Sequence, residues 1–246
     1  FGRNCIEIAE ILFGAAKAGH PFMPLNWRLA PREAAAIIED SQCRLLFVDA
    51  ALRETVDAAL AFVPSPPRII EFVANGAAWL GGFADAAPDD DPALPVSEEA
   101  TALQMYTSGT TGLPKGVELM HSGFTMMRLI EHLEPAANWA SGDTFLMFMP
   151  NFHMSGVGWL IQCLYNGMTV IVLPQFEPGA GTPEHQERQR GLLALQHEVQ
   201  QAFLLVAGLV RNRLNVGIGG LPLASHGPLR AVAVAIGPNL EAAASA

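Results

Sequence analysis

The stretch YTSGTTGLPKGV, from Tyr106 to Val117, decides how this 246-residue chain is interpreted. Its three glycines allow positive φ angles and a close approach of the backbone to a ligand. Consecutive backbone N–H groups in such a turn converge on an anion. Hydroxyl side chains add neutral donors, and Lys115 adds a positive charge. The composition therefore predicts a phosphate-binding loop.

This loop differs from the Walker A loop of P-loop nucleotide-binding proteins. No glycine directly precedes Lys115, and Gly116 follows it where the Walker pattern needs Ser or Thr. A P-loop kinase is therefore disfavoured, and a different phosphate chemistry is indicated.

The same stretch resembles the signature loop of the adenylate-forming (AMP-binding) superfamily, and is most like that of acyl-CoA synthetases, the fatty-acid–CoA ligases. In that family the loop holds the β- and γ-phosphates of ATP while a carboxylate attacks the α-phosphorus. The resemblance implies that Lys115 stabilises the departing pyrophosphate. The nucleotide-binding residues that it implies are Thr107, Ser108, Gly109, Thr110, Thr111, Gly112 and Lys115.

A second stretch, PNFHMSGVG from Pro150 to Gly158, resembles the next motif of the family. There an aromatic residue and a histidine line the junction between the acyl pocket and the α-phosphate. The resemblance implies that His153 is catalytic together with Lys115. The substrate-pocket residues that it implies are Phe152, His153, Gly156 and Gly158. The run from Asn4 to Leu29 is also similar to the family, and its expected role is packing.

The implied activity is ATP-dependent activation of a small carboxylic acid through an acyl-adenylate, followed by thioester formation with coenzyme A. ATP, Mg²⁺ and coenzyme A are the implied co-substrates and cofactor. The family's Mg²⁺ ligand is a glutamate of a motif that this sequence does not contain, so no metal ligand is predicted. Two alternatives stay open: an adenylation domain with a carrier-protein acceptor, and an inert remnant or interaction domain.

Composition narrows the class of protein further. A formal charge of −10 argues against nucleic acid as a partner, because such binders need clustered Lys and Arg. The longest apolar runs, such as 202–210, are far shorter than the ~20 residues that cross a bilayer, which predicts no transmembrane segment. Three separated cysteines without zinc-site spacing indicate reduced thiols. A cytoplasmic protein is expected.

Strand-like and helix-like segments alternate over residues 1–74. Asn4 is expected to cap a helix in which Ile8, Ile11 and Leu12 recur at helical spacing. Further helices are predicted at 32–40 and 52–62, and strands at 22–25, 44–48 and 68–73. This alternation predicts an α/β fold. The resemblance implies that this α/β fold is the large N-terminal domain of the adenylate-forming fold. The domain is expected to be incomplete, with helices packed on mixed β-sheets.

The chain divides into four expected parts. Residues 1–74 form an N-terminal α/β segment that starts inside the domain, and 75–100 a surface connection without periodicity. Residues 101–176 carry the phosphate loop and the acyl pocket, and 177–246 a divergent, truncated continuation. Strands are predicted at 102–106 and 116–120 around the loop, and at 144–149 and 168–173 around the second motif. Helices are also predicted at 121–134 and 184–201, and a further strand at 202–206.

The last part departs from the family pattern. Ile236 stands in the turn where the family places a small residue beside the adenine. The family's ribose-binding motif and its small C-terminal domain with a catalytic lysine do not follow, so we expect the chain as written to be inactive. A natural fragment, a pseudogene product and a mispredicted gene all fit this ending.

Overall fold

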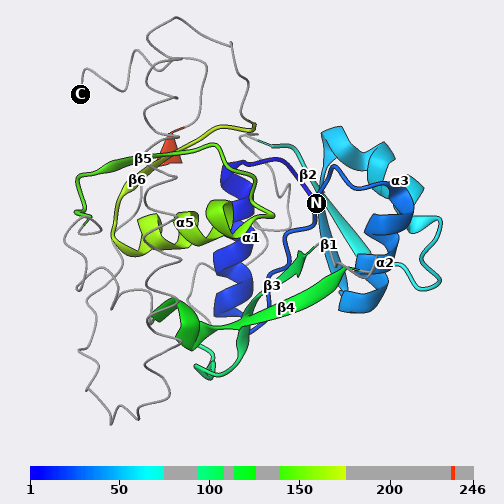
Figure 1. Cartoon of the computed structure of the whole chain (residues 1–246), viewed down its shortest axis with the longest axis horizontal. Helices are drawn as coiled ribbons and strands as arrows, with labels where there is room; N and C mark the ends of the chain where they lie inside the picture. Colours follow the sequence, from blue (N-terminus) through cyan, green and yellow to red (C-terminus); the bar gives the residue numbers. More distant parts are fainter. Residues whose placement is uncertain (75–92, 108–113, 126–138, 176–233, 236–246) are drawn as a thin grey trace, which may run out of the picture.

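The computed structural model describes residues 1–74, 93–107, 114–125, 139–175 and 234–235. In these ranges three small sheets are covered by helices (Figure 1). The sheets include parallel and antiparallel pairs, so the predicted α/β class with mixed sheets is confirmed. No helix in the described ranges has the length and apolar character needed to cross a membrane.

Helix α1 (Ile6–Lys17) lies at the centre of the molecule (Figure 1). Its buried side chains include Ile8, Ile11 and Leu12, so the predicted apolar face is confirmed. Gly19 follows the helix with a φ of +69°, a conformation that glycine adopts without strain.

The predicted helix cap is wrong. Cys5, not Asn4, is the N-cap residue of α1, and its side chain makes no capping hydrogen bond. The Asn4 amide instead donates to the carbonyl oxygens of Met149 and Leu173, at distances of 2.9 and 3.1 Å. Asn4 therefore joins distant parts of the chain and does not serve its own helix.

The first sheet pairs β1 (Leu45–Asp49) with β2 (Arg68–Phe72) in parallel. Helix α2 (Pro31–Ser41), the 3₁₀ turn η1 (Ala50–Leu52) and helix α3 (Arg53–Leu60) accompany it. Figure 1 shows α2 and α3 together beside this sheet. Buried side chains of these helices and of β1, including Val48 and Val56, form one apolar core. The predicted helices and strands here are confirmed within one or two residues at each end.

The second sheet is a hairpin of β3 (Thr101–Thr107) and β4 (Lys115–Met120). The predicted strand–loop–strand arrangement is therefore confirmed. The strand predicted at 22–25 is wrong, because only Phe22 forms a bridge, to Leu103. Of the helix expected from 121, residues 121–125 are helical and 126–134 lie outside the described ranges.

The third sheet has the order β5 (Thr144–Met147), β6 (Thr169–Val172) and β7 (Val234–Ala235), all parallel. Helix α5 (Met154–Tyr165) connects β5 to β6 and crosses α1 in Figure 1. Buried residues of α1, α5, β3, β5 and β6 form a second apolar core. The helix predicted at 184–201 and the strand at 202–206 lie outside the described ranges.

Candidate active site

The predicted phosphate loop connects strands β3 and β4 of the hairpin. The last pair of the hairpin joins Thr107 to Lys115, and both are exposed. The five predicted binding residues between these two strands lie outside the described residues; they are Ser108, Gly109, Thr110, Thr111 and Gly112. The structure thus places the two ends of the loop side by side, with one hydroxyl and one ammonium group at its base.

The loop end of the hairpin is attached to helix α2. The Tyr106 hydroxyl donates to the Asp40 carboxylate at 2.6 Å and accepts from the Gln104 amide at 3.3 Å. Burial and the Asp40 hydrogen bond raise the pKa of Tyr106 well above its usual value, so it remains a donor at neutral pH. Across the hairpin, a Cβ atom on Gly116 would lie only 3.2 Å from the Tyr106 ring and hydroxyl. A side chain at 116 would therefore press against this anchor.

The second motif follows strand β5 and opens helix α5. The His153 N–H donates to the Pro150 carbonyl at 3.0 Å, and the His153 carbonyl accepts from Gly156 at 2.8 Å. Phe152 is buried and the His153 side chain is exposed. Their ring centroids are 4.8 Å apart. The turn therefore presents an imidazole to solvent on a buried aromatic support.

A cationic side chain faces this turn from the N-terminal segment. The Arg28 guanidinium lies 5.8 Å from the Phe152 ring centroid and 4.8 Å from that of Trp27. Partial desolvation lowers the pKa of His153 below its ordinary value, and the Arg28 charge lowers it further. The neutral form of His153 is therefore favoured at pH 7, and in that form one ring nitrogen is an acceptor and the other a donor.

The two glycines of the motif have different surroundings. A Cβ atom on Gly156 would lie 2.1 Å from the Pro150 carbonyl oxygen and 2.9 Å from that of Met149. On Gly158 it would meet only the flexible end of Met154, at 3.0 Å. The first glycine is needed where helix α5 packs against the preceding backbone. A substrate-lining role for either glycine stays a prediction.

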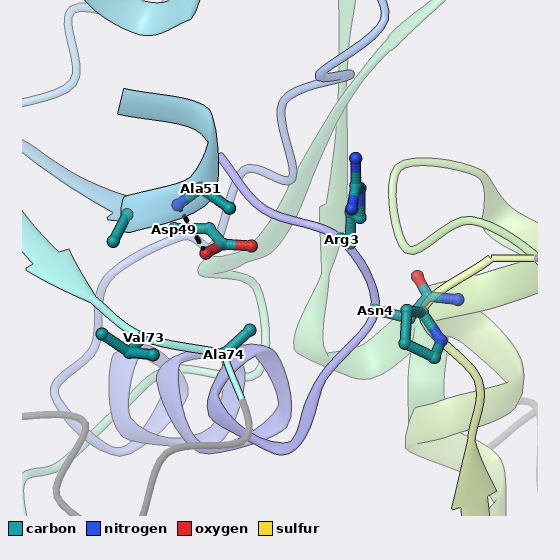
Figure 2. Close-up of a pocket in the computed structure, with 8 residues that line it drawn as sticks. Arg3, Asn4, Asp49, Ala51, Val73 and Ala74 are labelled. Carbon is teal, nitrogen blue, oxygen red and sulfur yellow. Dashed lines mark hydrogen bonds between the residues drawn. The ribbon is translucent and has the colours of Figure 1, made fainter. Parts of the chain in front are cut away.

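A cavity of about 230 Å³ lies at the carboxyl ends of β1 and β2 (Figure 2). Arg3, Asn4, Asp49 and Val73 line it, and the Asp49 carboxylate accepts from the Ala51 N–H at 3.1 Å. None of the predicted site residues that the structure describes is among its lining residues. Of the described site residues, neither Thr107 and Lys115 at the ends of the loop nor Phe152 and His153 of the aromatic turn lines the cavity.

In the part of the chain that the structure describes, no three His, Cys, Asp or Glu side chains group closely enough to hold a metal ion. The Mg²⁺ ion that the resemblance implies stays a prediction.

The site contains residues that sequence reasoning did not identify. Asp40 anchors the loop hairpin, Arg28 faces the aromatic turn, and Asn4 and Asn151 are buried at 3% and 2% exposure beside that turn. The sequence signal that could have identified Asn151 is its position at a strand-to-helix junction, next to the aromatic pair.

The sequence comparison identifies the family. The model described as AMP-binding enzyme matches residues 1–188. The chain belongs to the AMP-binding enzyme family. The resemblance inferred from the loop and the aromatic turn is thereby confirmed.

Individual relatives of this AMP-binding chain are ligases and synthetases by name. The fatty acid–[acyl-carrier-protein] ligase ScoC of Streptomyces coeruleorubidus is 36% identical over 177 residues, or 71% of this chain and 33% of that protein. The feruloyl-CoA synthase of an Amycolatopsis species is 36% identical over 180 residues, covering 73% of this chain and 34% of that protein. The chain thus spans about a third of the length of these curated relatives.

A solved structure is similar over a comparable share of the chain. The fatty acyl CoA synthetase of Mycobacterium tuberculosis superposes with a TM-score of 0.61 and 28% identity. The superposition covers 72% of this chain and 34% of the Mycobacterium chain. The adenylate-forming fold expected from the sequence is confirmed for this N-terminal part.

Proposed function

We propose that the protein containing this chain activates a carboxylic acid with ATP and transfers the acyl group to a thiol. The acid's carboxylate attacks the α-phosphorus, which forms an acyl-adenylate and releases pyrophosphate. The thiol then attacks the acyl carbonyl and releases AMP. The observation that carries this proposal is the Tyr106–Val117 stretch, closed at its base by the Thr107–Lys115 pair, in a chain of the AMP-binding family.

The loop residues would act on the departing pyrophosphate. Negative charge grows on the leaving oxygens as the bond to the α-phosphorus breaks. Fixed N–H, hydroxyl and ammonium donors at those oxygens stabilise the transition state more than the ground state. Lys115 supplies the positive charge, and the exposed position of its side chain leaves it free to reach the phosphates. The two paired strands and the Tyr106–Asp40 bond limit how far the loop base can move.

The aromatic turn would receive the acid. Phe152 supplies an apolar wall, and the neutral imidazole of His153 offers a hydrogen bond near the reacting carboxylate. Keeping His153 neutral suits this role, because a carboxylate nucleophile next to a full positive charge is a weaker nucleophile. The lowered pKa of His153 supports this assignment.

Coenzyme A is the acceptor that we propose. The name of the feruloyl-CoA synthase supports this choice. The name of ScoC favours a second candidate, an acyl-carrier protein, which presents its acyl-accepting thiol on a protein surface. We propose a cytoplasmic location, supported by the described cysteines Cys5, Cys43 and Cys163, none of which forms a disulfide.

An acceptor competition tests the function. The protein in its full natural length is incubated with ATP, a panel of carboxylic acids and either coenzyme A or a phosphopantetheinylated carrier protein. Thioesters are detected by mass spectrometry and the nucleotide product by chromatography. AMP release with acyl-CoA supports the proposal, and AMP release with acyl-carrier protein alone selects the second candidate. ADP as the product, or no acid-dependent nucleotide turnover, would refute acid activation through an adenylate.

A further inference from the structure

Two buried asparagines join three segments that are distant in sequence. Asn4 precedes α1, Asn151 lies in the turn after β5, and Leu173 follows β6. The Asn4 amide donates to Met149 at 2.9 Å and to Leu173 at 3.1 Å. Its side-chain oxygen accepts from the Asn151 backbone N–H at 2.9 Å. The Asn151 amide donates to the Gly2 carbonyl at 3.1 Å.

The orientation of the Asn4 side chain is dictated by its partners. Two carbonyl oxygens can only accept, and a backbone N–H can only donate. The Asn4 nitrogen must therefore face Met149 and Leu173, and its oxygen must face Asn151. Both amide hydrogens and the side-chain oxygen of Asn4 form hydrogen bonds, and the residue is only 3% exposed.

These bonds lie at the carboxyl ends of two parallel strands. The Leu173 N–H still pairs with Met147 at 2.8 Å, in continuation of the β5–β6 register. Beyond that pair, the Met149 and Leu173 carbonyls both accept hydrogen bonds from Asn4. Ligands of open parallel sheets bind beyond the carboxyl ends of the strands. Asn4 therefore fixes the geometry of the edge from which the aromatic turn departs.

The turn itself is held from two sides. On one side, Asn151 is bonded through both its backbone N–H and its side chain, directly before Phe152. On the other side, Gly156 of α5 packs against the Pro150 backbone. An apolar residue at position 4 could fill the same space, but it would leave the Met149 and Leu173 carbonyls without donors. The two asparagines therefore add directional hydrogen bonds as well as packing.

We propose that Asn4 and Asn151 are positioning residues that set the placement of the Phe152–His153 turn at the acid-binding end of the site. This inference rests on the proposed function for its link to substrate. The Phe152 ring and the His153 imidazole then keep their place relative to Arg28 because the backbone before them is fixed by Asn4 and Asn151. Without those bonds the turn relaxes and the acid is held less well.

The test compares Asn4→Ala and Asn151→Ala with Val56→Ala, in the full-length protein. Val56 is fully buried in the other apolar core, so its truncation lowers stability without touching the turn. Asn151→Ala keeps the hydrogen bond from the backbone N–H of residue 151 to Asn4. If Asn4→Ala does not fold, Asn151→Ala alone tests the positioning role. Michaelis constants are measured for acid and for ATP, and the His153 imidazole is titrated by NMR.

Both asparagine variants are expected to raise the KM for the acid by about tenfold or more, because displacements near 1 Å cost up to about 10²-fold in well-ordered sites. The KM for ATP should change little, since the strands that flank the phosphate loop, β3 and β4, belong to a different sheet. The pKa of His153 should rise toward its ordinary value as the turn opens to water. Val56→Ala should leave both KM values and the titration unchanged.

The contrary results are equally definite. Asparagine variants that lose stability, as Val56→Ala does, but keep the acid KM and the His153 titration would overturn the positioning role. If the parent protein shows no acid-dependent turnover, the proposed function fails. The His153 titration then decides the positioning role by itself, because it needs no substrate.

Discussion

The close packing of helix α5 against the turn before it makes Gly156→Ala a sharp perturbation. The added Cβ atom would lie 2.1 Å from the Pro150 carbonyl oxygen, 2.6 Å from its carbonyl carbon and 2.9 Å from the Met149 oxygen. All three atoms belong to the backbone, so no side chain can rotate away. The start of α5 or the turn itself must move.

The magnitude follows from these distances. Favourable contacts between heavy atoms lie near about 3.5 Å, so a displacement of roughly 1 Å or more is required. Overpacking of this kind costs about 1–3 kcal/mol, and a backbone obstacle places this site at the upper end. Replacing glycine by alanine in a helix returns about 1 kcal/mol. We expect a net loss of about 2 kcal/mol in the free energy of unfolding.

Gly158→Ala is the matched control in the same helix. Its Cβ atom would meet only the Met154 side chain, whose terminal carbon lies 3.0 Å away and can rotate. The helix-propensity gain of about 1 kcal/mol should then offset or exceed the packing cost. Urea unfolding of both variants, followed by the fluorescence of the tryptophans, measures the difference. Equal stability of the two variants would refute the claim that Gly156 is required by backbone contact.

Two further predictions concern the groups beside the site. Arg28→Gln should raise the pKa of His153, because a neighbouring positive charge that disfavours the imidazolium is removed. An NMR titration of His153 checks this. An unchanged pKa would leave desolvation as the sole cause of the lowered pKa. Tyr106→Phe and Asp40→Ala should each lower the free energy of unfolding by about 1 kcal/mol, and the double variant should lose less than the sum, because both remove the same 2.6 Å hydrogen bond. Since the pKa of Tyr106 is raised, this bond is fully present below pH 10 and is lost only as the pH rises through the folded-state value. Additive losses in the cycle would show that the bond contributes nothing to stability.

The helices and strands of residues 1–74 could be predicted because their local patterns agree with the fold. Ile8, Ile11 and Leu12 have helical spacing and are buried together. Pro31 marks a first helical turn and is the first residue of α2. The short apolar strand at 22–25 was over-predicted, since its formation depends on a partner and only Phe22 meets one.

The candidate site could be predicted in part. The loop stretch indicated the hairpin, and the strands on both sides are as expected. The role of Asn4 could not be predicted from local sequence, because its partners Met149 and Leu173 are 145 and 169 residues away. For the same reason the Asp40 contact with Tyr106 and the Arg28 contact with Phe152 became visible only in three dimensions.

The most direct test of the account is acid-dependent exchange of labelled pyrophosphate into ATP, measured on the full-length protein and on its Lys115→Ala variant. Exchange reports adenylate formation alone and does not depend on the thiol acceptor. The account predicts exchange that requires a carboxylic acid and falls by about 10²-fold or more in the variant, because a charge-stabilising donor at the leaving group is lost. Exchange that is absent in the parent protein, or unchanged in the variant, would contradict it.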